Sequence, residues 1–146
     1  MKYNIKIVDE SNKEINLGED EIIDINYKIG LVEKGDYANS RSSTELEIVG
    51  KMISNIEEKN ESENLYKINK ENLINLIKWA ESYMEKTDYR DVDINIDLGS
   101  EKYIDYKFNN MFVYEFLQEF SIEKGIGIFN IKLRQKFNQK NKLDVK

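Results

Sequence analysis

The segment EIIDINYKI, Glu21–Ile29, decides the fold, because apolar and polar side chains alternate along it. Ile and Tyr occupy the odd-numbered positions from 23 to 29, and Asp, Asn and Lys occupy the even ones. A period of two is typical of a β-strand that is buried on one face only. The segment TELEIVG, Thr44–Gly50, repeats the pattern, so the two segments predict neighbouring strands.

A polar stretch, GDYANSRSST at Gly35–Thr44, lies between these two strands. It is long for such a connection, since two residues can close a hairpin and most connections have about 4–6 residues. We therefore expect a flexible loop over Leu31–Ser43.

The remaining strands follow from the same alternation, with turns at SNKE and GSEK. In the last of them the apolar phase shifts, which predicts either a bulge near Phe129 or burial on both faces. The predicted strands are KYNIKIV at 2–8, EINL at 14–17, DVDINIDLG at 91–99, YIDYKFNN at 103–110, MFVYEFLQEF at 111–120 and IGIFNIKLRQKF at 126–137.

One segment in the middle of the chain has helical periodicity instead. In NKENLINLIKWAESYM the apolar residues recur at i, i+3 and i+4, which predicts one helix from about Lys70 to Glu85. Asn69 is the predicted N-cap, with Glu71 facing the positive end of the helix dipole. Trp79 is expected to pack in the core.

These elements predict an α+β fold: a mainly antiparallel β-barrel or sandwich of about seven strands with one central helix at about 70–85. The 146 residues suit a single domain, 1–146, and no repeat or interdomain linker is seen. Hydrophobic residues make up 40% of the chain and charged residues 34%. No apolar run approaches the roughly 20 residues that span a bilayer, and the first residues lack the pattern of a signal peptide. We expect no membrane association.

The net charge of −6 argues against nucleic acid as the main ligand, because such binding depends on neutralising phosphates. The charge is uneven along the chain: an acidic loop is expected at 57–64 and a basic C-terminal tail at 138–146. We expect the acidic segment to be a solvated loop and the basic segment a frayed tail. The alternative is that they are complementary ends in a head-to-tail assembly.

The chain contains neither histidine nor cysteine. This excludes Ser-His and Cys-His nucleophilic sites, disulfides and the usual zinc ligand sets. No glycine-rich phosphate loop is present. We therefore expect a protein that is not an enzyme, with no cofactor and no metal.

Carboxylates are the only remaining candidates for chemistry. The stretch beginning at Asp91 has the ligand spacing of a calcium loop at its start, but Ile96 replaces the required glycine and Lys102 the closing glutamate. A hydrolase that uses a carboxylate pair drawn from Asp93, Asp97 and Asp105 is the alternative. Acids on the polar face of a strand, however, are usually only solvated.

The order of the elements resembles that of the Hcp-type tube proteins of type VI secretion and the tail-tube proteins of contractile phage tails and injection particles. The resemblance covers about 22–137: strand EIIDINYKI, a loop ending in ANSRSST, strand ELEIVGK, a central helix, then DVDINID, KYIDYKFNNMFVYEFLQEF and GIGIFNIKLRQK. The acidic insertion and the basic tail depart from the family pattern.

The resemblance implies a structural subunit that forms hexameric rings, which stack into a hollow tube inside a contractile sheath. Partners would be copies of the chain, sheath and baseplate proteins, and DNA or effector cargo in the lumen. The strand faces that carry Asp91, Asp93, Asp97 or Asp105 are candidates to line that lumen. Assembly would take place in the cytoplasm, and the product would be part of a virion or of a phage-tail-like particle that can be released. A tube-initiating or baseplate component and a carboxylate-cluster binding module are the alternatives.

In the family, the loop between early strands reaches a neighbouring subunit or ring. The resemblance therefore implies that Leu31–Ser43 is an assembly arm; a merely exposed hairpin loop is the alternative. Small residues allow close approach of another backbone, and an arginine offers a fork of donors to a partner. The expected contact residues are Gly35, Asp36, Tyr37, Asn39, Arg41 and Ser42.

Overall fold

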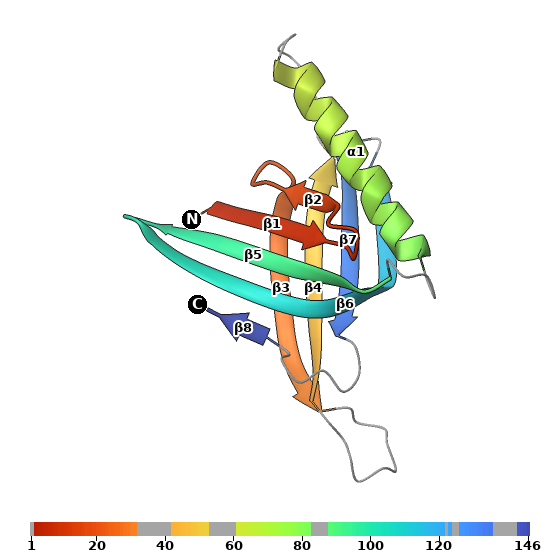
Figure 1. Cartoon of the computed structure of the whole chain (residues 1–146). Coiled ribbons are helices and arrows are strands. Elements are labelled where there is room, and N and C mark those ends of the chain that lie inside the picture. The colour runs from red at the N-terminus through yellow and green to blue at the C-terminus, as the bar shows by residue number, and fades with distance from the viewer. Residues whose placement is uncertain are drawn as a thin grey trace.

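The computed structural model describes residues 2–31, 42–52, 61–82, 88–121, 123, 126–135 and 143–146, as one antiparallel sheet and one helix (Figure 1). The elements are β1 Lys2–Val8, β2 Glu14–Leu17, β3 Ile22–Leu31, β4 Ser42–Met52, α1 Glu61–Glu81, β5 Arg90–Gly99, β6 Lys102–Ser121, β7 Ile126–Gln135 and β8 Leu143–Val145.

The sheet has eight strands in the order β2-β1-β5-β6-β7-β4-β3, and β8 pairs with β6. Every pairing is antiparallel. The order folds back on itself as two crossing layers (Figure 1). The first layer contains β2, β1, β5, the first half of β6 and β8, and the second layer contains the second half of β6, β7, β4 and β3.

A single long strand, β6, connects the two layers. Its first half pairs with β5 and its second half with β7, and Met111 is the residue that pairs with both. Asn110 has a left-handed backbone (φ 51) at this point, and its amide donates to Asp91 Oδ1 at 3.0 Å. Gln135 Nε2 donates to the Asn109 carbonyl at 3.0 Å. The chain therefore turns the corner with local hydrogen bonds on both sides of the bend.

The core lies between the two layers and follows the predicted alternation. It is built from the inward-facing side chains of β1, β2 and β5 on one side and of β4 and β7 on the other. The fully buried residues include Ile5, Ile7, Leu17, Leu46, Ile48, Val92, Phe108, Ile131 and Leu133. Burial of apolar surface stabilises a fold by about 25 cal/mol per Å², so the packing of the two crossed layers is the main contribution to the stability of the folded state.

The sheet path ends at β2 and β3, and no ladder joins these two strands among the described residues. The predicted antiparallel α+β fold is confirmed, but the closed barrel is not seen in this part of the chain. The described sheet has eight strands where about seven were predicted, and β8 is the one that no predicted segment covers. The two strands predicted at 103–110 and 111–120 are one continuous strand.

The predicted helix exists, but it begins at Glu61 rather than near Lys70. Asn69 is therefore a buried residue inside the helix and not its N-cap, and neither polar atom of its side chain has a hydrogen-bond partner among the described residues. Residues 61–68, which precede Asn69, contain no proline or glycine, and their Glu, Leu and Lys residues favour a helix. Trp79 is fully buried as predicted, and its Nε1 donates to the Asp88 carbonyl at 2.7 Å.

Several predicted boundaries are corrected by the strand pairings. The β7 register with β4 runs without a shift through Phe129, so the predicted bulge there is wrong; Ile128 simply points outward. The end of the basic tail is not frayed, since Leu143–Val145 pairs with β6. Leu31 pairs with Ser42, so both ends of the predicted 31–43 loop belong to strands. The last part of the acidic loop, 61–64, is helix.

Gly50 provides a test of the packing between β3, β4 and β7. A Cβ atom on Gly50 would lie 2.1 Å from Phe129 Cζ and 2.8 Å from the Glu21 carbonyl oxygen. Phe129 is buried and stacked on Phe116, so the ring has no free space to move into. We expect Gly50→Ala to lower the free energy of unfolding by about 1–3 kcal/mol in urea titrations.

Gly18→Ala is the matched control, since a Cβ there meets nothing within 4 Å. It should change the free energy of unfolding by no more than about 0.5–1 kcal/mol. Equal destabilisation by both substitutions would contradict the packing described for Gly50.

Candidate assembly surfaces

The outer face of the second layer carries rows of polar cross-strand pairs. In one row, Glu45 of β4 accepts from Lys28 of β3 at 3.3 Å and from Arg134 of β7 at 3.0 Å. The Arg134 guanidinium also lies 4.2 Å from the ring centroid of Tyr114. The row therefore ties β3, β4, β7 and β6 together on the side that faces away from the core.

A second row lies next to the first. It consists of Glu47 of β4, Lys132 of β7 and Glu115 of β6, and Lys132 Nζ lies 3.3 Å from Glu115. Asn130 Nδ2, from the following row of β7, donates to Glu47 at 3.0 Å. The hydrogen bond and charge of Glu115 raise the pKa of Lys132. Exposed ion pairs contribute at most about 1 kcal/mol each, so these rows fix strand register more than stability. These ion pairs cover one part of the outer face, and the exposed apolar side chains of Leu117 and Ile128 lie further along it.

The edge of the second layer is β3, and it is long and open. No described strand pairs with its outer edge. Tyr27 and Ile29 point toward the interior side, opposite Leu46 and Thr44 of β4, yet both remain about half exposed. Long edges with apolar side chains promote pairing with another chain unless they are covered. This edge is the most distinctive candidate interface in the described part of the chain.

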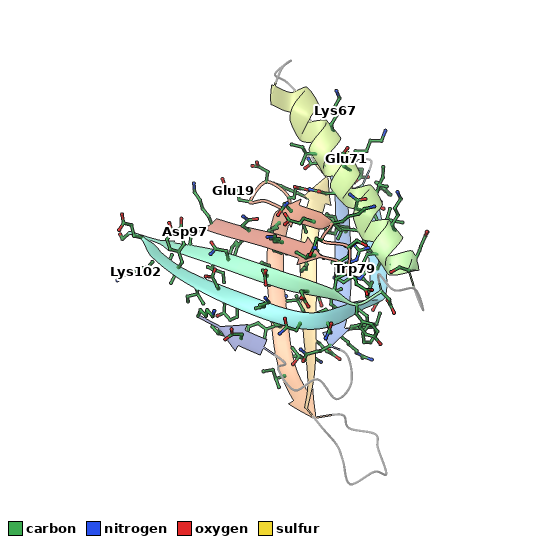
Figure 2. All side chains as sticks on the ribbon, viewed as in Figure 1. Glu19, Lys67, Glu71, Trp79, Asp97 and Lys102 are labelled. Atoms are coloured by element: carbon green, nitrogen blue, oxygen red, sulfur yellow. The ribbon has the colours of Figure 1, made fainter. Side chains whose placement is uncertain are left out.

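The predicted acidic residues of β5 and β6 lie on the outer face of the first layer. Asp93 is opposite Lys6 and Lys107 in the strand register, and Asp97 is opposite Lys2. Figure 2 shows Asp97 and Lys102 at the far tip of the β5–β6 hairpin, away from α1.

The carboxylates of this face bind neighbouring groups of the same hairpin. Asp97 Oδ1 accepts from the Gly99 amide at 2.8 Å, and Asp105 accepts from Asn95 Nδ2. Among the residues that the structure describes, no group of three acidic side chains gathers as a metal site would require. The arrangement is that of a solvated, locally bonded strand face.

The predicted assembly loop lies almost wholly outside the described residues. Of its named contact residues, only Ser42 belongs to a described element, where its backbone begins β4 opposite Leu31. The structure brings the two ends of the loop together at the tip of the β3–β4 hairpin. The roles of Gly35, Asp36, Tyr37, Asn39 and Arg41 stay predictions.

The helix is anchored to the sheet through a buried polar contact. Asn72 Nδ2 of α1 donates to the Asn16 carbonyl at 2.8 Å and to both carboxylate oxygens of Glu21 at 3.1 Å. Burial raises the pKa of Glu21, and the charge of Asp20 adds to this, while the hydrogen bonds from Asn72 and the Gly18 backbone oppose it. A buried carboxyl therefore positions α1 against the start of β3.

A charged groove lies between α1 and the β1–β2 turn. It is lined by both signs of charge, including Asp9, Lys13, Lys78, Glu81 and Arg90. Burial lowers the pKa of Arg90 although Asp9 opposes the shift, and the Arg90 guanidinium lies 5.3 Å from the Trp79 ring centroid. The mixture of signs gives the groove no preference for an anionic or a cationic ligand.

Within the described ranges, no helix is long and apolar enough to cross a membrane.

No protein-family model matches the sequence, and no curated protein is similar to it. Solved structures do match. Hcp1 from the E. coli EAEC 042 pathovar aligns with a TM-score of 0.58 and 8% identity over 100% of this chain and 98% of that chain. Hcp1 from Flavobacterium johnsoniae aligns at 0.54 and 10% identity, over 99% and 94%.

A third match is a chain of the PVC extracellular contractile injection system, in the structure of its sheath/tube terminator in the extended state. It aligns at a TM-score of 0.53 and 14% identity, over 99% of this chain and 92% of that chain. The chain has the fold of the Hcp-type tube proteins. The resemblance inferred from element order is thereby confirmed at the level of fold, and no relative named here is described as an enzyme.

The sequence did not predict the ion-pair rows of the second layer. Lys28, Glu45 and Arg134 are far apart in the chain, and only the strand register brings them together. The signal that was available is weak: charged residues occupy the polar positions of all three strands.

Glu21→Gln tests the buried carboxyl by its pH dependence. The folded-state pKa of Glu21 is raised above the ordinary 4.5, so the folded state favours the protonated form. Its contribution is fully stabilising below that ordinary pKa and is lost as the pH rises through the folded-state pKa. The stability of Glu21→Gln relative to wild type should therefore increase from pH 4 to pH 7, measured by urea unfolding.

Glu14→Gln, a change at an exposed carboxylate paired with Lys6 at 3.1 Å, is the control and should show no such increase. A stability difference between Glu21→Gln and wild type that does not vary with pH would contradict the assignment.

Proposed function

We propose that this chain is a structural subunit of a hollow tube, built from stacked rings, in a contractile phage-tail-like particle or secretion system. The observation that carries the proposal is the second layer: four antiparallel strands with rows of ion pairs on the outer face and, among the described residues, an open edge at β3. The fold shared with Hcp1 supports it.

The strand directions suit lateral closure into a ring. The second layer has an even number of strands, all antiparallel, so β3 and the second half of β6 run in opposite directions. When β3 of one copy lies against β6 of the next, the new pair is also antiparallel. Repetition of this heterologous contact closes a ring, and a ring of six is the family expectation.

In such a ring the outer face of the second layer lines the lumen. Its charges are largely neutralised within the rows, which leaves a hydrated wall past which DNA or effector proteins slide without binding tightly. Asp91, Asp93, Asp97 and Asp105 belong to the other layer and face away from this lumen. Leu31–Ser43 extends the end of the wall as an assembly arm to a neighbouring subunit or ring.

The expected partners are other copies of the chain, then sheath and baseplate proteins, with assembly in the cytoplasm. A tube terminator or a baseplate component is the second candidate, favoured by the match to the sheath/tube terminator structure. Stoichiometry separates the two, because a tube subunit outnumbers a terminator many times in a particle.

Ile29→Lys tests the lateral edge. Ile29 is 56% exposed, so a charge there should change the free energy of unfolding by no more than about 0.5 kcal/mol. A lysine on an edge strand opposes pairing with another chain. We expect wild-type protein to form ring-sized species and tubes with increasing concentration, and Ile29→Lys to stay monomeric, as measured by sedimentation and negative-stain electron microscopy.

Ile68→Lys is the matched control, because Ile68 is 50% exposed but lies on α1 and not on a strand edge. It should assemble like the wild type. Normal assembly of Ile29→Lys, or wild-type protein that stays monomeric even with its sheath partner, would contradict the proposed function.

A further inference from the structure

Exposed apolar side chains lie on the interior face at both edges of the second layer. Tyr27 and Ile29 of β3 are 46% and 56% exposed, and Phe120 of β6 is 70% exposed. Phe120 shares its face with Phe116, which packs against the core. Beyond Met111, β7 is the only described strand that pairs with β6, so this half of β6 is an edge of the layer, as β3 is. The two edges that the proposed ring joins therefore both carry exposed apolar groups.

Within one copy, these side chains lie in different cross-strand rows. Phe120 is in the row of Gly127, which lies past the point where β3 begins to pair with β4. Ile25 of β3 is in the row of Ile131, four residues further along β7. Phe120 of one copy therefore meets β3 of the next copy only when the two strands are displaced along their length.

Closure of the layer into a ring requires such a displacement. Strands that close into a barrel are typically tilted by about 35–45°. Each copy adds the four strands of its second layer, or roughly 19 Å at about 4.8 Å per strand, and residues follow at about 3.4 Å along a strand. A displacement of four residues per copy gives a tilt of roughly 35°, whereas two residues give roughly 20° and six give roughly 47°. An odd number would place interior side chains of one copy beside outer side chains of the next, so four residues fit best.

The direction of the displacement follows from the apolar side chains. In one direction, Ile25 comes opposite Phe120 of the next copy, and Ile29 comes opposite Phe116. Tyr27 then lies diagonal to both phenylalanines, which is within reach of an aromatic side chain. In the other direction, and also without displacement, the row of Phe120 contains no residue of β3 and its ring stays exposed. The first direction is therefore the one that covers the exposed side chains of both edges.

The charges of the outer face do not select the register. Lys28 of one copy would lie opposite Leu117 of the next and diagonal to Glu115 and Glu119. Asp24 would also lie diagonal to Glu119, and Glu115 already has a lysine partner in its own copy. Attraction and repulsion nearly balance, so the apolar contact on the interior face is what fixes the displacement.

We propose that β3 of one copy pairs with the second half of β6 of the next at a displacement of four residues, with Phe120 packed against Ile25 and Tyr27 of its neighbour. The inference rests on the proposed tube function and deepens it, because it assigns the register and the anchoring side chain of the lateral contact. A few buried aromatic side chains commonly carry most of the binding energy of an interface. Phe120 is exposed in a single copy because the residues that cover it belong to the neighbour.

Phe120→Ser and Tyr103→Ser form a matched pair of variants. Both remove an exposed aromatic ring from β6, but Tyr103, which is 56% exposed, lies in the first layer, outside the proposed contact. Phe120→Ser should unfold at the wild-type urea concentration and should raise the protein concentration needed for ring formation at least about tenfold. Tyr103→Ser should form rings at the wild-type concentration. Sedimentation measures ring formation.

Engineered disulfides measure the displacement, since the chain contains no cysteine. In the double variant Lys28→Cys/Leu117→Cys, each copy should cross-link to the next under mild oxidation, because directly opposite residues have Cα atoms within the roughly 7 Å that a disulfide requires. A non-reducing gel should show a ladder of covalent oligomers. In the control Lys28→Cys/Phe112→Cys, the two positions belong to the register without displacement and would lie roughly 14 Å apart along the strands, so monomers should remain.

The outcomes separate this contact from the tube function. Rings of Phe120→Ser at the wild-type concentration, or cross-linking of Lys28→Cys/Phe112→Cys in place of Lys28→Cys/Leu117→Cys, would overturn the proposed register and leave the tube function standing. Rings in which neither double variant cross-links would overturn the register as well. Wild-type protein that forms neither rings nor tubes would overturn the proposed function itself.

Discussion

The structure depends on one constraint: β6 must leave one layer and enter the other without a break in its hydrogen bonds. At Met111 the strand pairs with β5 and β7 at once, and the left-handed Asn110 turns the backbone there. Because the sheet is folded at this one corner, its inner faces come together as a core, and among the described residues no ladder joins its two end strands, β2 and β3. The open β3 edge, from which the proposed function follows, is a direct consequence of that fold.

The fold could be predicted to a large extent, because period-two alternation survives wherever one face of a strand is buried. The strands around Ile25, Ile48 and Val92 were predicted for that reason, and the order of elements was enough to indicate the tube-protein fold. Alternation does not report where a strand changes partners, so β6 was divided at Asn110. Nor does it report short strands such as β8, where only three residues pair.

The helix start was missed for a different physical reason. Asn69 precedes the apolar stripe and has a good capping side chain, so local chemistry predicted a helix start there. The helix instead extends back to Glu61, and Asn69 is buried with no side-chain hydrogen-bond partner in the described part of the chain. Tertiary contacts, such as that of Asn72 with Glu21, determine where α1 lies, and such contacts have no signature in sequence. The candidate interfaces share this limit, since ion-pair rows and open edges follow from register.

Amide hydrogen exchange is the most direct test of whether β3 is the lateral assembly edge. Exchange of the Ile22–Gly30 amides should be compared between dilute protein and the assembled species. The edge amides of β3 should exchange rapidly in the monomer and become strongly protected in rings and tubes, while the core strands β4 and β7 should be protected in both. Assembled particles in which β3 exchanges as fast as in the monomer would contradict the assignment of β3 as that edge.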